Sequence, residues 1–98
     1  MTMTRELNGT DLKIGLEGRL DTITAPELEA ELNRSMAGAE SLTLDFTGLD
    51  YVSSAGLRVL LSAHKAMSPK GGIKVKNANE IVREVFEVTG FADILTIE

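Results

Sequence analysis

The sequence predicts a single α/β domain in which a mixed sheet of four to five strands carries its helices mainly on one face. Segments with apolar residues at every second position alternate with segments in which apolar residues recur three or four positions apart, so strands alternate with helices. The strands alternate apolar with polar residues, which indicates one face exposed to water. The 98 residues contain no linker and no internal repeat, so residues 1–98 form one domain.

The first two strands are predicted to form a hairpin. Asn8 and Gly9 tolerate the positive backbone angles of a tight turn, and the preceding segment TMTREL is suited to a short strand. The second strand alternates polar residues with the apolar residues Leu12, Ile14 and Leu16.

The first helix is predicted to begin at Thr24. Thr24 and Glu27 have the spacing of a capping box, and Pro26 is tolerated in the first helical turn. We expect the helix to end at Gly38, after an apolar stripe formed by Ala25, Leu28, Leu32 and Met36.

Two further strands flank the second helix, one around residues 42–46 and one around residues 73–75. The helix is expected to begin near Ser54 and to end before Pro69. Its apolar residues are Leu57, Leu60, Leu61 and Met67.

The third helix is predicted to run from Asn79 to Gly90, a residue suited to the position after a helix. It would bury Val82, Val85 and Phe86, and the tail FADILTIE would form a last short helix or strand. Short strand–helix–strand connections imply parallel neighbours and right-handed crossovers, to which the hairpin adds one antiparallel strand.

Composition excludes several classes of protein. The chain has no cysteine and one histidine, so disulfides, thiolate chemistry and a histidine metal cluster are not expected, and we predict no metal site and no cofactor. The formal charge of −5 argues against nucleic acid and anionic lipid as partners. No apolar run approaches the ~20 residues that cross a bilayer, and the N-terminus does not resemble a signal peptide, so we expect a cytoplasmic protein that does not bind membranes.

The residues do not predict an enzyme. The elbow motif of serine hydrolases is absent, and His64 would lie about 15 Å along the helix from Ser54, too far to act as its base. No phosphate-binding loop follows any strand, and Gly15 and Gly18 lie within or just after a strand rather than before a helix. Asp21 leaves two interpretations open, a turn residue that bonds its own backbone or a polar contact for a ligand or partner at the strand ends.

Four segments, in order and in register, resemble the STAS domains of anti-sigma factor antagonists. The signature is LDYVSSAGLRVLL, residues 49–61, and the supporting segments are GRLDTITAPEL, KGGIKV and VREVFEVTGFADIL. The resemblance covers the chain from about residue 10 to its end. It implies a mixed sheet with helices largely on one side and no catalytic activity.

The resemblance also implies partners and a mechanism. Unphosphorylated, such a protein binds a serine kinase with a GHKL-type ATP site, which otherwise holds a sigma factor or another target. Phosphorylation of one serine releases the kinase, and a phosphatase resets the cycle. The free protein is expected to be a monomer.

Aligned on Gly56 and Leu57, the phosphoacceptor of the family falls on Ser54, with Ser53 as the second choice. The chain departs from many members by having Ser53 where they have an aspartate, and Ala55 where a second hydroxyl is common. The kinase-facing residues implied by the resemblance are Asp21, Thr22, Val52, Ser53, Ala55, Gly56 and Arg58. The alternative is a STAS domain that acts as a scaffold or ligand sensor and is never phosphorylated.

Overall fold

The computed structural model describes residues 1–98 and contains a five-stranded sheet in the order β1-β2-β3-β4-β5. Strand β1 is antiparallel to β2, and all other neighbours are parallel, which confirms the predicted mixed sheet. The elements in chain order are β1 (Thr2–Asn8), β2 (Asp11–Leu20), α1 (Ala25–Ser35), β3 (Ser41–Val52), α2 (Ser54–Met67), β4 (Ile73–Lys76), α3 (Glu80–Thr89), the 3-10 helix η1 (Phe91–Asp93) and β5 (Thr96–Ile97).

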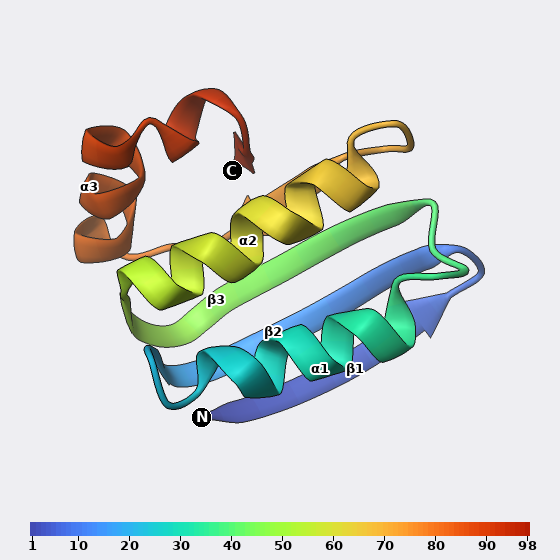
Figure 1. Ribbon diagram of the computed structural model, residues 1–98, viewed down its shortest axis with the longest axis horizontal. Coiled ribbons are helices and arrows are strands. Elements are labelled where there is room, and N and C mark those ends of the chain that lie inside the picture. The colour runs from blue at the N-terminus through green and yellow to red at the C-terminus, as the bar shows by residue number, and fades with distance from the viewer.

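The strand order explains why the helices gather on one face. From β2 to β5, every helical crossover moves to the next strand in the same direction across the sheet. Right-handed crossovers that all move in one direction place their helices on the same side. Accordingly, α1 and α2 lie side by side over one face of the sheet, and α3 lies beyond the start of α2, on the side away from α1 (Figure 1).

A single core fills the space between the sheet and the helices. It contains 24 buried apolar residues, and no polar side chain is buried with them. Phe46 of β3 and Phe86 of α3 are both buried, with ring centroids 6.3 Å apart, and so anchor α3 to the sheet. The predicted apolar alternation of the strands is confirmed, whereas Leu61 is only half-buried.

The opposite face of the sheet is polar. Lys13 forms an ion pair with Asp45 across β2 and β3, at 4.0 Å, and Lys76 pairs with Glu98 at 3.7 Å. Gly15 and Gly18 lie within β2, so they form no phosphate-binding loop. The predicted hairpin is confirmed, and Gly9 adopts its positive φ of 62°.

The predicted capping box of α1 is not formed. Thr24 has a helical backbone (φ −93°, ψ −20°), and its hydroxyl donates to the carbonyl of Arg19 at 2.6 Å instead of accepting from the first turn. Helix α1 also ends at Ser35, before Gly38. Helices α2 and α3 begin as predicted, with the extended residues Ser53 and Asn79 as side-chain caps.

The tail was predicted to form either a short helix or a short strand, and it forms both, the 3-10 helix η1 and the strand β5. The longest helix, α2, has 14 residues, and no helix combines the length and the apolar character that a membrane span requires.

Candidate functional site

The candidate site lies where the parallel strands β2 and β3 end. We call this region the carboxyl edge and define it as residues 19–24 and 51–58. The backbone N–H of Ser53 donates to the carbonyl of Leu20 at 2.8 Å and so joins the end of β2 to the start of α2. Ligands and partners of α/β domains commonly bind at this edge of a sheet.

The two adjacent serines have different positions. Ser53 is half-buried and extended (φ −91°, ψ 175°), and its hydroxyl oxygen accepts from the N–H of Gly56 at 3.4 Å. Ser54 is the first residue of α2, and its side chain is exposed. One hydroxyl therefore caps the helix, and the other is open to a second protein.

The surroundings of Ser54 are suited to a negative charge. The first amide N–H groups of a helix have no intrahelical acceptor, and the helix dipole is positive at this end. The first turn of α2 contains no acidic residue, and the exposed Arg58 lies one turn further on. A phosphate on Ser54 can therefore be accommodated without a change in the fold.

The different positions of the serines predict different effects on stability. Ser53→Ala removes the cap and is expected to lower the free energy of unfolding by about 0.5–1 kcal/mol, near the lower end for helix caps because the bond is long. Ser54→Ala removes no intramolecular hydrogen bond and is expected to change stability by less than ~0.5 kcal/mol. Urea unfolding of both variants measures the difference, and an equal or larger loss for Ser54→Ala would contradict the assignment of Ser53 as the cap.

Asp21 organises the turn between β2 and α1. Its carboxylate accepts from the backbone N–H groups of Ile23 at 3.0 Å and Thr24 at 3.1 Å, so the turn interpretation describes its local role. The pKa of Asp21 lies below its ordinary value, chiefly because of the bond from the Thr24 N–H, with smaller contributions from Ile23, the Thr24 hydroxyl and Arg19. Asp21 is therefore ionised at neutral pH.

Arg19 links this turn to the end of β3. Its guanidinium forms an ion pair with Asp21 at 3.7 Å and lies 4.7 Å from the ring centroid of Tyr51. The sequence interpretation did not include Arg19 or Tyr51. Their cross-strand pairing, which brings them together, depends on the register between β2 and β3.

Ile23 is also part of the carboxyl edge and was missed from sequence. Its side chain is 82% exposed, beside the exposed Thr22. An apolar residue directly before a helix cap usually packs against the first turns of the helix, but the exposure of Ile23 shows that it does not. The side chain of Ile23 is therefore available to solvent or to a second protein.

Two residues implied as kinase-facing have no exposed side chain. Val52 is buried in the core, and Gly56 is buried against β2. A β-carbon on Gly56 would lie 2.7 Å from Cγ of Leu20 and 3.1 Å from its carbonyl oxygen. Gly56 therefore lacks a side chain because α2 packs closely against the end of β2 at this position. It does not leave open space for a partner.

Gly56→Ala is expected to destabilise the domain, although alanine ordinarily favours a helix over glycine. The new methyl group would overlap Leu20 and push the first turn of α2 from the sheet, at a cost of about 1–3 kcal/mol. Thermal unfolding measures the loss. Gly38→Ala is the matched control because nothing lies within 4 Å of that position, and equal stability of the two variants would contradict the close packing.

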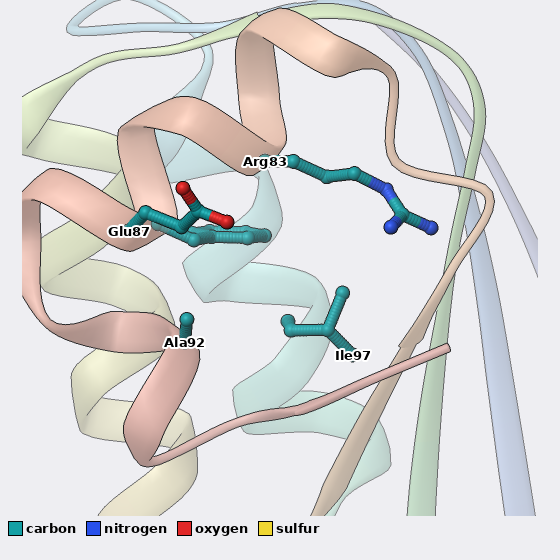
Figure 2. Close-up of a pocket in the computed structure, with 5 residues that line it drawn as sticks. Arg83, Glu87, Ala92 and Ile97 are labelled. Carbon is teal, nitrogen blue, oxygen red and sulfur yellow. The ribbon is translucent and has the colours of Figure 1, made fainter.

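A second hollow lies between α3, η1 and β5. This cavity of about 220 Å³ is lined by Arg83, Phe86, Glu87, Ala92 and Ile97 (Figure 2). The guanidinium of Arg83 already donates to the carbonyls of Ala78 and Glu98, at 3.0 and 3.3 Å. The lining contains no nucleophile beside a base, and no cluster of possible metal ligands exists in the structure.

Comparison with known families and proteins gives a consistent result. The family model described as "Mlab, STAS domain" matches residues 3–96. The chain is similar to the putative anti-sigma factor antagonist BtrV of Bordetella bronchiseptica, with 40% identity over 84 residues that cover 84% of this chain and 72% of that protein. It is 29% identical over 91 residues to the anti-sigma-B factor antagonist of Bacillus subtilis, covering 92% of this chain and 84% of the relative.

Solved structures share the fold. The crystal structure of an anti-sigma factor antagonist from Mycobacterium paratuberculosis has a TM-score of 0.88 and 22% identity, covering 98% of this chain and 83% of that one. The structure of the anti-sigma factor antagonist SpoIIAA in its unphosphorylated form has a TM-score of 0.84 and 19% identity, covering 99% and 88%. At these identities the likeness concerns the architecture alone.

Proposed function

Because the chain belongs to the STAS domain family, we propose that it is an anti-sigma factor antagonist, a regulatory protein that acts by binding and not by catalysis. The names of the relatives from Bordetella bronchiseptica and Bacillus subtilis support this role. The fold adds that the polar residues of two strand ends and the start of α2 form one exposed region.

The proposed partner is a serine kinase with a GHKL-type ATP site, which the unphosphorylated protein occupies. The observation that carries the proposal is the exposed hydroxyl of Ser54 at the first position of α2, beside a serine already used as the cap. The kinase transfers the γ-phosphoryl group of ATP to Oγ of Ser54. The hydroxyl proton passes to a base, and ADP is the leaving group.

The kinase-facing surface is proposed to comprise the exposed parts of the carboxyl edge. The half-buried Asp21 and the exposed Thr22 present the turn after β2, the half-buried Ser53 and Ala55 present the start of α2, and the exposed Arg58 lies one turn further on. The buried Val52 and Gly56 hold these two segments together. Ile23 supplies an apolar contact beside the polar ones.

The charge and size of the phosphate on Ser54 account for release of the protein from the kinase. Phosphate adds about −1.5 to −2 charge, and the positive end of α2 tolerates it, so the fold is retained while the surface changes. In the contact with the kinase, the same dianion brings bulk, desolvation and repulsion from acidic groups. Like charges at an interface cost several kcal/mol, comparable with the ~5.5 kcal/mol that inverts a two-state equilibrium.

The test is phosphorylation of the purified protein by its cognate kinase with ATP. Intact mass is expected to increase by one phosphate, and fragmentation is expected to place that phosphate on Ser54. Ser54→Ala should remain unmodified, whereas Ser53→Ala should still be phosphorylated. A phosphate on another residue of the wild type would overturn the site, and an unmodified wild type would favour a scaffold or ligand-sensing STAS domain.

The remaining parts of the cycle follow from the same proposal. A phosphatase removes the phosphate and restores binding, and the protein is a monomer in the cytoplasm when free. The target that the kinase releases is a sigma factor or another protein held at the same kinase.

A further inference from the structure

The outer face of α3 combines exposed apolar residues with unpaired acids. Ile81 is 59% exposed and Val88 is 77% exposed. Residues seven positions apart lie almost in line along a helix, so these two side chains form one stripe. Together with Ile94, which follows the helix, they are three of the five large apolar side chains that the domain exposes.

A row of glutamates runs beside this stripe. Glu80, Glu84 and Glu87 are all exposed, and none of them forms an ion pair or a side-chain hydrogen bond within the domain. Among the other acidic residues, Asp21, Glu31, Asp45 and Glu98 form ion pairs, whereas others, such as Glu27 and Glu29 on α1, form none. The one basic residue of α3, Arg83, donates to backbone carbonyls instead.

We propose that the outer face of α3, defined as Glu80, Ile81, Glu84, Glu87 and Val88, is a docking surface for a basic amphipathic segment of a partner protein. An apolar stripe beside an acidic row is complementary to a helix that carries an apolar stripe beside lysines or arginines. A second copy of this chain does not fit, because a symmetric contact would place the same glutamates against each other. The surface is separate from Ser54 and does not depend on phosphorylation.

The test uses ¹⁵N-labelled protein and two synthetic amphipathic helical peptides of equal length, one of leucine and lysine and one of leucine and glutamate. The leucine–lysine peptide is expected to shift the amide resonances of residues 80–94 and to bind more weakly as salt increases. The leucine–glutamate peptide should cause no shift. Shifts at the carboxyl edge or spread over the whole domain, or equal binding of both peptides, would overturn the proposal.

Two sets of variants complete the test. The double variant Ile81→Ser, Val88→Ser is expected to raise the Kd of the leucine–lysine peptide by about tenfold or more, and Leu7→Ser, which changes an exposed apolar residue on β1, should leave it unchanged. The double variant Glu84→Gln, Glu87→Gln should reduce the salt dependence of peptide binding.

Sedimentation of the wild-type protein without peptide should show a monomer. If the wild type were instead a dimer, and the variant Ile81→Ser, Val88→Ser a monomer, this face would be a self-association surface and the proposal would be overturned.

Discussion

Ser54→Asp is expected to weaken binding to the cognate kinase by about ten- to a hundredfold, which corresponds to ~1.4–2.8 kcal/mol. Aspartate places one negative charge where the proposed phosphoserine would carry about two, so its effect should be smaller than that of phosphorylation. The exposed position of Ser54 means that the substitution disturbs no packing. Binding can be measured by calorimetry with the purified kinase.

Stability measurements separate this effect from damage to the helix. An acidic residue in the first turn of a helix is favourable by about 0.3–1 kcal/mol, so the unfolding midpoint of Ser54→Asp should equal or slightly exceed that of the wild type. Ser54→Asn is the matched control, because it has nearly the shape of aspartate without its charge, and it should bind the kinase more tightly than Ser54→Asp. Equal affinities of the two variants, or unfolding of Ser54→Asp, would contradict a mechanism based on charge.

Phe46→Ala is expected to produce the largest loss of stability, about 3–5 kcal/mol. Phe46 is completely buried in β3, and its ring lies 6.3 Å from that of Phe86, which in turn lies 6.5 Å from Phe91. Removing the ring leaves a cavity between the sheet and α3, because the surrounding strands cannot collapse into it. A domain of this size has a total free energy of unfolding of about 5–15 kcal/mol. The variant would therefore be partly unfolded at temperatures at which the wild type is still fully folded.

Thermal unfolding followed by circular dichroism measures this loss, and a decrease of the midpoint by about 15 °C or more is expected. Phe46→Leu is the control, since it keeps most of the buried volume and should cost clearly less. The half-buried Phe91 provides a second comparison, and Phe91→Ala should also cost less than Phe46→Ala. A loss below ~1 kcal/mol for Phe46→Ala would show that α3 is not held by this ring.

Local sequence patterns predicted the features that depend on local contacts. Helix α2 begins near Ser54 and α3 next to Asn79, as expected, because the side-chain oxygens of Ser53 and Asn79 each accept an N–H only three residues along the chain. The alternation of the strands and the left-handed Gly90 after α3 depend on neighbouring residues in the same way. The handedness of the crossovers follows from chirality, and the polar residues that alternate with apolar ones in the strands predicted one wet face, so the one-sided arrangement of the helices was also predictable.

The missed features depend on contacts between distant parts of the chain. Thr24 does not cap α1 because its hydroxyl donates to the carbonyl of Arg19, a residue only five positions earlier whose place is set by the pairing of β2 with β3. The role of Gly56 depends on Leu20, which is 36 positions earlier and whose place is set by sheet pairing. Strand β3 continues through residues 47–52, beyond the predicted segment. This extension was missed because the irregular register with β2 interrupts the alternation of apolar and polar residues.

The parallel arrangement of β2, β3 and β4 gives the domain an electrical polarity, because each connecting helix must begin at the carboxyl ends of the strands. Helices α1 and α2 run nearly parallel over the sheet and both begin at the carboxyl edge (Figure 1). Their peptide dipoles therefore point the same way, and their positive ends lie together at this edge of a molecule whose net charge is −5. Acidic groups on another protein are attracted to these helix ends, which favours encounters in which the carboxyl edge faces that protein.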